Sequence, residues 1–463
     1  PIGNLNGPSE LDVESLELIP GASSALYGPN AFNGILLVNS KNAFEYQGLS
    51  AFAKVGVNHV GKDADYENGP APMWEGAIRY AKAFNNKFAF KINLAGMMAQ
   101  DWHGTSAIDR EVARTPGYGS DGQWSFNPGA DRLHYMGDEA SINLSIFRFS
   151  SSWNTFASTS NPYYNNNFEP GLTAKTNADS GDLTNQVVSV TPYREVDLID
   201  YNAKNYKGNL GLYYRLNDNA ELSYLYNGGF GTSIYTGAQR YSLKNFSIQQ
   251  HRVQLRGSNY YVRAYGTFEN SGDSYITEFF AKRVIDESVK AANPLFSDVS
   301  GFLATYGTEY LRYLYDNGYQ PGSMNPGDPD YITNDATRLQ VQQAAHLYAR
   351  QSTDSKFIYD LSTSAGRAAF NTAKKKAETG VVPKGPFFND KTKMYHAEGQ
   401  YDFKNEIDFM ELQAGASFRM YDLNSNGTIF DDLDGITIKE YCAYVQAGKW
   451  LGNRLFKIIG SWG

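Results

Sequence analysis

Apolar and polar residues alternate in many stretches of this chain. Between residues 87 and 100, for example, Phe90, Ile92 and Leu94 share one face, whereas Lys91 and Asn93 share the other. Alternation with a period of two residues is typical of β-strands that have one apolar and one polar face. The pattern predicts eleven strands, at about 49–58, 74–84, 87–100, 205–216, 220–232, 246–257, 260–270, 393–404, 407–419, 438–450 and 454–463.

The connections between these strands fall into two alternating classes. One class is short and rich in Asn, Asp and Gly, as in Asn85-Asn86 and Asn405-Glu406. These residues tolerate the positive φ of tight hairpins. The other class is longer, at about 59–73, 101–204, 233–245, 271–392 and 420–437. Short turns at one end and long loops at the other favour an outer-membrane β-barrel. The alternation alone leaves a soluble sandwich or a lipocalin-like barrel open.

The connection at about 271–392 is predicted to be helical. Apolar residues with a 3.6-residue period indicate helices at 276–292, 301–316, 335–351 and 363–378. Asn334 or Asp335 is placed to cap the third helix, and Lys374-Lys375-Lys376 suits the end of the fourth. We expect ordered surface structure here, which either holds a ligand or protects the rim of the barrel.

The connection at about 101–204 is rich in Gly, Asn, Ser, Tyr and Trp. Its aromatic side chains are candidates to stack on a sugar or to pack against a peptide, and packing within the loop explains them equally well. The candidates for contact with a substrate are Trp102, Trp124, Trp153, Tyr163 and Tyr164.

Composition narrows the functional classes. The 463 residues include 41 basic and 49 acidic side chains, for a net charge of −8, which argues against a general nucleic-acid-binding protein. The single cysteine, Cys442, excludes an internal disulfide framework. The longest apolar run, around Ile35-Leu36-Leu37-Val38, is too short for a membrane helix of about 20 residues. No nucleophile-elbow or P-loop pattern occurs, so we do not expect an enzyme.

One motif suggests a metal. The residues Asp422, Asn424, Asn426, Gly427 and Thr428 follow the spacing of the front half of a calcium loop. Such a loop wraps a hard cation with side-chain and carbonyl oxygens. Position twelve is a leucine, so a neighbouring aspartate would have to close the site. A plain Asn/Gly turn explains the same residues. A calcium ion is therefore a candidate ligand, and no other cofactor is expected.

Residues 12–41 carry a more specific pattern. An acidic stretch that includes Glu14 and Glu17 is followed by Gly21-Ala22-Ser23-Ser24-Ala25-Leu26-Tyr27-Gly28 and then by the run Gly34-Ile35-Leu36-Leu37-Val38 before Lys41. This stretch resembles the end of the plug domain of TonB-dependent outer-membrane receptors. The plug-motif residues carried over by this resemblance are Gly21, Ser23, Ser24, Tyr27, Gly28 and Gly34. The glycines suit turns or close approaches of the backbone.

A looser match lies at 436–463, which is similar to the mid-barrel hairpin of these receptors. Together the two matches imply an all-β transmembrane fold, an antiparallel outer-membrane β-barrel that follows the end of a plug. We expect residues 1–46 to be the C-terminal part of the plug. Residues 47–463 would then form the first half of the barrel, with about eleven of 22 strands. The large helical loops resemble the SusC-like type, which imports glycans, peptides or other bulky nutrients.

The resemblance implies import of a bulky nutrient (a glycan, a peptide or a metal chelate) across the bacterial outer membrane. The expected partners are membrane lipid and lipopolysaccharide, the TonB complex through a segment before residue 1, and a surface lipoprotein lid; nucleic acid is not among them. Two alternatives stay open. One is a barrel subunit with a structural or assembly role in an outer-membrane complex, and the other is a soluble all-β glycan-binding module.

Overall fold

A computed structural model describes residues 7–20, 34–60, 69–110, 127–144, 187–237, 239–319, 332–378, 385–451 and 456–462. Within it the chain divides into two compact units. The sheet unit comprises Pro1–Trp102, Tyr201–Tyr275 and Phe388–Gly463, and the helical unit comprises His103–Asp200 and Ile276–Phe387. The two longest connections of the predicted barrel therefore fold together as a unit of their own. The predicted plug segment belongs to the sheet unit.

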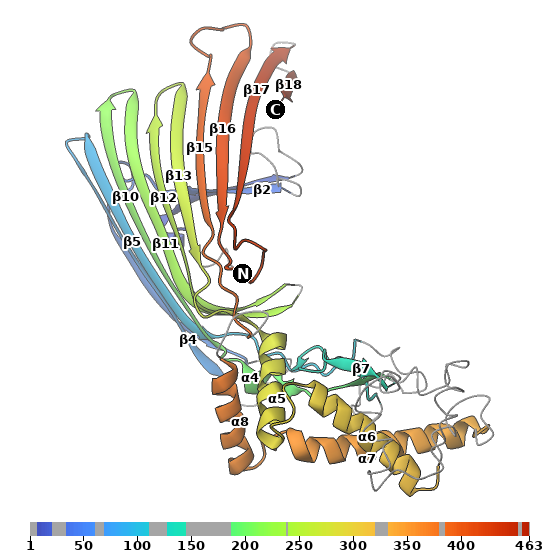
Figure 1. Ribbon diagram of the computed structural model, residues 1–463. Coiled ribbons are helices and arrows are strands. Elements are labelled where there is room, and N and C mark those ends of the chain that lie inside the picture. The colour runs from blue at the N-terminus through green and yellow to red at the C-terminus, as the bar shows by residue number, and fades with distance from the viewer. Residues whose placement is uncertain are drawn as a thin grey trace. The chain divides into compact units, whose positions relative to one another are not determined.

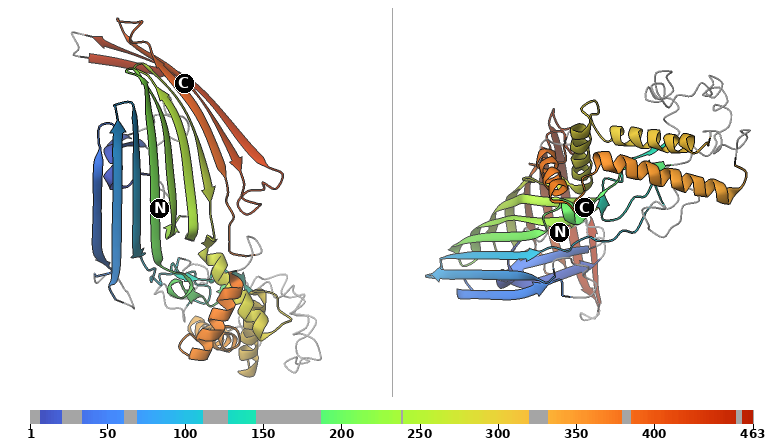
Figure 2. Two further views of the ribbon diagram at one scale, coloured as in Figure 1. Left: turned by 90° about the vertical axis from the view of Figure 1, so that its left-hand side faces the viewer. Right: turned by 90° about the horizontal axis from the view of Figure 1, so that it is seen from below.

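The sheet unit is built on eleven antiparallel strands in chain order, so every strand pairs with the one before it (Figure 1). The strands are β3 (Gly48–Asn58), β4 (Ala71–Phe84), β5 (Phe88–Gln100), β10 (Asn202–Asn217), β11 (Ala220–Thr236), β12 (Arg240–Arg256), β13 (Tyr260–Asn270), β15 (Lys393–Asp402), β16 (Glu411–Leu423), β17 (Ile436–Leu451) and β18 (Phe456–Trp462). Seen from the side and from below, they form one curved sheet (Figure 2). The eleven predicted strands are confirmed.

The first tight turn forms as its residues predict. Asn85 and Asn86 have φ angles of 49° and 51°, and the Lys87 amide donates to the Phe84 carbonyl oxygen at 3.0 Å. Positive φ at both central residues is the mark of a type I′ hairpin, whose twist matches that of the flanking strands.

Two predicted connections were wrong. We expected a long loop at 233–245. Instead, β11 continues to Thr236 and β12 begins at Arg240, so the connection between them is short. We also expected a turn at Asn405-Glu406, but β15 ends at Asp402 and β16 begins at Glu411. There the amides of Glu406 and Ile407 donate to the Phe403 carbonyl oxygen, which closes a wider bend. In both cases hydrogen bonds of the backbone close the connection, from the Gly237 amide to the Gln239 carbonyl oxygen and to the Phe403 carbonyl oxygen.

The helical unit contains α4 (Glu195–Leu198), α5 (Thr277–Ala292), α6 (Ser300–Asp316), α7 (Asp335–Phe357) and α8 (Ser364–Ala377). The short strands β6 (Tyr135–Met136) and β7 (Ser141–Asn143) pair with β9 (Tyr193–Arg194) and β8 (Val187–Ser189), and β14 (Tyr275–Ile276) precedes α5. The four long helices confirm the predicted ones. None of the described helices combines the length and apolar character needed to cross a membrane.

The helix caps explain where these helices begin. The Asn334 side chain accepts a hydrogen bond from the Thr337 amide, and the Thr363 side chain accepts one from the Gly366 amide. Of the two residues that we considered as the cap of α7, Asn334 is therefore the one that caps it. Each such bond satisfies one of the free amides at a helix start and contributes about 1 kcal/mol.

Helices α6 and α7 enclose a polar group in their apolar interface. The Tyr306 hydroxyl lies 2.9 Å from Nδ1 of His346, and both side chains are buried. Burial lowers the pKa of His346 to about 3, so the imidazole stays neutral at physiological pH. The interface therefore carries no pH switch in the physiological range.

Arg350 on α7 joins the two stretches of the helical unit. Its guanidinium donates to the Pro128 and Ser189 carbonyl oxygens at 3.0 and 2.8 Å, and to the Thr191 hydroxyl at 2.9 Å. The side chain is buried, so these acceptors have no bulk water to replace it. Arg350 thus binds both 127–144 and 187–200 to α7, and the Thr191 hydroxyl adds a second bond by donating to Oδ1 of Asp354 at 2.5 Å.

We expect Arg350→Met to destabilise the helical unit by about 3 kcal/mol, because buried carbonyl oxygens lose a charged donor. Hydrogen exchange should then speed up by about a hundredfold in 127–144 and 187–200, with no change in the sheet strands. The matched control is Arg367→Met, since Arg367 is exposed and donates to the Leu361 carbonyl oxygen alone among the described contacts. Equal effects of the two substitutions would contradict this role for Arg350.

Candidate functional site

The two faces of the sheet have opposite polarity, and the burial is the reverse of that in a soluble protein. In β4, Trp74, Ile78 and Tyr80 are 55%, 45% and 40% exposed, whereas Arg79 and Ala81 between them are 3% and 1% exposed. We call the face with Arg79 the inner face and the face with Trp74 the outer face. Apolar side chains cover the outer face, and charged and small side chains lie on the inner one.

The same division continues into β5. Ile92 and Leu94 on the outer face are 42% and 53% exposed, whereas Lys91 and Asn93 on the inner face are 1% and 0% exposed. The strand pairing carries this pattern from strand to strand, since residues directly opposite each other share a face. A row of exposed apolar side chains beside buried charges suits a sheet whose outer face contacts lipid.

A row of side-chain amides crosses the inner face. Asn93, Asn209 and Asn227 stand directly opposite one another on β5, β10 and β11. Their amide groups hydrogen-bond in series, at 2.9 Å and 2.7 Å. Because each amide both donates and accepts, the row can satisfy buried polar groups without a net charge.

Asp12 forms the centre of the most buried charged group. Its Oδ1 accepts from Nε of Arg79 and its Oδ2 accepts from Nζ of Lys91, each at 2.7 Å. All three side chains are 2–3% exposed. Asp12 comes from the predicted plug segment, whereas Arg79 and Lys91 come from β4 and β5. One carboxylate therefore bridges the segment to two neighbouring strands.

The same two cations also bind backbone oxygens of the plug segment. Arg79 Nη1 donates to the Tyr46 carbonyl oxygen at 2.9 Å, and Lys91 Nζ donates to the Lys41 carbonyl oxygen at 2.8 Å. The Lys41 amide donates to the Asp12 carbonyl oxygen at 2.8 Å. The start and the end of the plug segment thus meet at one anchor on the inner face.

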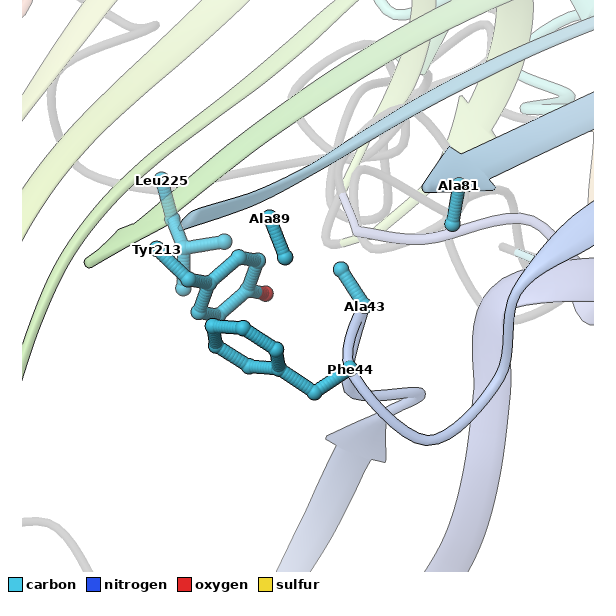
Figure 3. Close-up of a cluster of buried hydrophobic side chains, with 6 residues drawn as sticks. All are labelled: Ala43, Phe44, Ala81, Ala89, Tyr213 and Leu225. Atoms are coloured by element: carbon cyan, nitrogen blue, oxygen red, sulfur yellow. The ribbon is translucent and has the colours of Figure 1, made fainter. Parts of the chain in front are cut away.

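Apolar side chains extend this anchor (Figure 3). The Phe44 ring meets the Tyr213 ring edge-on, with centroids 6.4 Å apart, and the Arg215 guanidinium lies 4.0 Å from the Phe44 ring centroid. The buried cluster consists of Ala43, Phe44, Ala81, Ala89, Tyr213 and Leu225. The alanines at these positions leave room on the inner face for the segment to pack closely.

A hollow of about 550 Å³ lies against the inner face of β13, β15, β16 and β17. Arg263 is paired with Glu398, and Nη1 of Arg419 lies 3.2 Å from a carboxylate oxygen of Glu440. Between them, Nε of Arg419 donates to Nδ1 of His396 at 3.3 Å. The charges alternate across four strands, which gives a polar lining without a large net charge.

Four other side chains complete the lining of this hollow. Tyr444 donates to Oε1 of Gln400 at 2.6 Å, and Gln400 donates to Gln413 at 2.8 Å. Cys442 also lines the hollow and is half-buried. Hydroxyl, amide and charged groups of this kind suit contact with a hydrated, hydrogen-bonding surface.

Of the plug-motif residues, only Gly34 lies in the described part of the chain. Its φ is 146°, and a Cβ atom there would lie 2.8 Å from the Ile19 carbonyl oxygen. The close approach predicted for Gly34 is therefore confirmed. The remaining motif residues lie outside the described residues: Gly21, Ser23, Ser24, Tyr27 and Gly28.

Trp102 is the one candidate loop aromatic that is described. It is 52% exposed, and the Arg240 guanidinium lies 5.4 Å from its ring centroid. The indole therefore already has a cationic neighbour, and its contact with substrate stays a prediction. Trp124, Trp153, Tyr163 and Tyr164 lie outside the described residues.

The segment around Asn424 forms a hydrogen-bonded turn. Asn426 and Gly427 have φ angles of 51° and 73°, and the Thr428 amide donates to the Ser425 carbonyl oxygen at 3.0 Å. The Asp432 carboxylate accepts from the amides of Ser425 and Gly427. These bonds hold the pKa of Asp432 below its usual range.

This geometry bears on the predicted calcium loop. Asp432, one of the aspartates considered to close the site, is used by backbone amides. The Thr428 hydroxyl donates to the Ser425 carbonyl oxygen at 2.6 Å, and Asp422 belongs to β16. The arrangement is that of an Asn/Gly turn, the alternative that the sequence left open. A calcium ion held by Asp422, Asn424, Asn426 and Thr428 stays a prediction.

The sequence did not predict the anchor, although it contained a signal for it. Arg79 and Lys91 are isolated cations among alanines on the inner faces of their strands. Small side chains beside a lone charge indicate a close partner of opposite charge. Alternation cannot show which acid is that partner, because Asp12 lies 67 residues from Arg79 and 79 residues from Lys91 in the chain.

No family model matches the chain, and no curated protein matches its sequence. Solved structures do match. The siderophore receptor PirA from Pseudomonas aeruginosa aligns over 94% of this chain and 40% of its own, with 8% identity and a TM-score of 0.39. The closed form of the ferric-catecholate import receptor Fiu from E. coli K12 aligns over 94% and 52%, with 11% identity and a TM-score of 0.36.

The copper transporter OprC aligns over 95% of this chain and 48% of its own, with 9% identity and a TM-score of 0.32. The chain thus spans about half the length, or less, of each of these proteins.

The anchor makes a measurable prediction. Asp12→Asn leaves Arg79 and Lys91 buried without a counter-charge, which should cost about 3–5 kcal/mol. Hydrogen exchange in 7–20 and 34–47 should then become about 10² to 10³ times faster.

The matched control is Glu10→Gln. Glu10 pairs with Lys54 at 2.6 Å, but its side chain is 57% exposed, so the change should cost about 1 kcal/mol or less. Adding Lys91→Met to Asp12→Asn should restore part of the protection, because it removes one of the two orphaned charges. If Asp12→Asn and Glu10→Gln behave alike, the buried network does not hold the segment.

Proposed function

We propose that this chain forms the end of the plug and the first half of the barrel of a TonB-dependent outer-membrane receptor. In this proposal the protein imports a bulky nutrient, with energy delivered through TonB, and performs no chemistry on it. The observation that carries the proposal is the reversed polarity of the sheet. Apolar side chains are exposed on the outer face, and charged ones are buried on the inner face.

Such a sheet is costly in water but suits a bilayer. Placing the exposed side chains of Trp74, Ile78, Ile92 and Leu94 against acyl chains removes their apolar area from water, at about 25 cal/mol per Å². The paired strands satisfy the backbone within the sheet, as a membrane requires. Both edge strands, β3 and β18, would then need partners, and further strands of the same barrel would provide them.

The hairpin of β1 (Val13–Pro20) and β2 (Gly34–Ser40) supports the plug assignment. Leu16 stands opposite Val38, and Leu18 stands opposite Leu36. These four side chains lie on one face and are 45–71% exposed. An isolated two-stranded hairpin is marginally stable. In the proposal, the rest of the plug covers this apolar face, while Asp12 anchors the other end of the segment to the barrel wall.

The proposal also covers the type of receptor and its substrate. The large helical unit suits the SusC-like type of receptor, which takes glycans, peptides or similarly bulky cargo, with a surface lipoprotein as a lid. A polar hollow lined by tyrosine, amide and paired charges is compatible with such hydrogen-bonding solutes. The helical unit would then face the outside of the cell.

A deletion in the complete protein distinguishes a transport role from a scaffold role. Deleting the segment that precedes the plug and contacts TonB should abolish uptake of the nutrient, while barrel assembly and surface display stay normal. Growth on the nutrient as sole source measures uptake, and antibody labelling of intact cells measures surface display. Undiminished uptake in the deleted protein would reject energised transport and favour a structural subunit.

A membrane sheet and a soluble one also respond differently to charge on the outer face. Leu94 lies at the middle of β5 and Leu216 near the end of β10, and they are 53% and 51% exposed. In a bilayer, Leu94→Arg should cost about 2–4 kcal/mol, but Leu216→Arg only about 1 kcal/mol or less.

Urea titration of the protein folded in lipid vesicles measures the two costs, and heat-modifiable mobility on a gel reports folding. A soluble glycan-binding module would tolerate both arginines equally well, because both positions would then face water. Equal stability of the two variants would therefore reject the membrane assignment.

A further inference from the structure

A group of three carboxylates belongs to the helical unit. Oxygen atoms of Asp131, Asp138 and Glu139 lie within 4.8 Å of one another. Asp138 is fully buried, and Asp131 is 9% exposed. Like charges this close repel each other strongly in a site with little water. The group therefore needs a positive charge or a proton to be stable.

Each carboxylate uses one oxygen in a bond that fixes its direction. Oδ1 of Asp131 accepts from Nη2 of Arg110 at 2.5 Å, and Oδ2 of Asp138 accepts from the Arg132 amide at 3.0 Å. Oε2 of Glu139 accepts from the Gly137 amide at 2.7 Å. These bonds leave the second oxygens of Asp138 and Glu139 available for another ligand.

The second oxygens of Asp138 and Glu139 are the unusual feature. Oδ1 of Asp138 and Oε1 of Glu139 are buried and accept no hydrogen bond from any described residue. A buried carboxylate oxygen without a donor is costly, by about 1–3 kcal/mol or more for a charged group. Burial accordingly raises the pKa of Asp138 well above its usual range and raises that of Glu139 to about 7.

The local backbone holds this arrangement rigidly. Gly137 has a φ of 114°, and a Cβ atom there would lie 2.6 Å from Cδ1 of Ile285 on α5. The Ala140 amide donates to the Gly137 carbonyl oxygen at 3.2 Å, which closes the turn that carries Asp138 and Glu139. The turn is therefore pressed against α5, and the two carboxylates cannot move apart freely.

We propose that Asp131, Asp138 and Glu139 bind a hard divalent cation, of which calcium fits best. Two oxygens that bind one calcium ion at about 2.4 Å lie at most about 4.8 Å apart. The oxygens of this group lie within that limit. The group has carboxylate oxygens and neither sulfur nor imidazole, so a soft metal is disfavoured. Irregular loop geometry with water in the remaining positions suits calcium better than magnesium.

Two arginines reduce the negative charge that this site offers to a cation. Arg110 binds Asp131, and the charge of Arg132 also favours the ionised form of Asp138. The pKa of Asp138 is raised even with Arg132 nearby. Burial and the charge of Glu139 therefore affect this pKa more than Arg132 does. The arginines thus reduce the negative charge but do not fill the free oxygens. The alternative occupant is a proton shared by Asp138 and Glu139, and the experiment below distinguishes the two.

The test uses the full-length protein in detergent, stripped with a chelator and then titrated with calcium alone by calorimetry or equilibrium dialysis. Wild-type protein should bind a calcium ion that Glu139→Gln binds at least tenfold more weakly and Asp138→Asn does not bind. The matched control is Asp360→Asn, an exposed acid of the same unit whose carboxylate holds the Ser362 amide. It should bind like the wild type.

Three results would overturn the proposal. One is no binding by the wild type at millimolar calcium, which would favour the shared proton. Another is equal binding by the wild type and Glu139→Gln, which stays informative if Asp138→Asn does not fold. The third is loss of the ion in Asp422→Ala alone, which would place calcium in the 422–428 turn. The readout is binding alone, so the result does not depend on the proposed transport function.

Discussion

One buried carboxylate fixes where the segment that carries Asp12 lies on the sheet. Asp12 neutralises Arg79 and Lys91, which would otherwise be two unpaired cations within the inner face. Breaking a buried pair costs more than forming it gains, since the partner left behind has lost its water. The interaction is therefore better understood as a requirement for position than as a source of stability. The predicted plug segment must lie where Asp12 reaches both strands.

The same constraint orders the rest of the inner face. Small side chains such as Ala81 and Ala89 admit Phe44 beside the ion group, and the row of asparagines continues the polar surface without net charge. Farther along the sheet, charges pair across strands around the hollow, as between Arg419 and Glu440. The inner face thus combines paired charges, amides and a buried apolar cluster, whereas the outer face is apolar and exposed.

The sequence predicted the strands well because alternation is a local property that survives folding. Turn chemistry at Asn85-Asn86 and capping at Asn334 were equally local, and both are confirmed. The end of β15 was wrong because the bend after Asp402 is set by bonds to one carbonyl oxygen and not by turn residues. The roles of Asp12 and Asp138 could not be read from the sequence, since each depends on burial that distant segments create.

Cys442 gives this chain a built-in chemical reporter. It is the one cysteine among 463 residues, and it stands opposite Ser417 on the inner face, where it lines the hollow. A thiol-reactive dye would therefore label these 463 residues at a single known place. Its rate of attachment would measure how open that place is to reagents of graded size. Fluorescence of the attached dye would then follow, in real time, whatever enters or leaves beside β17.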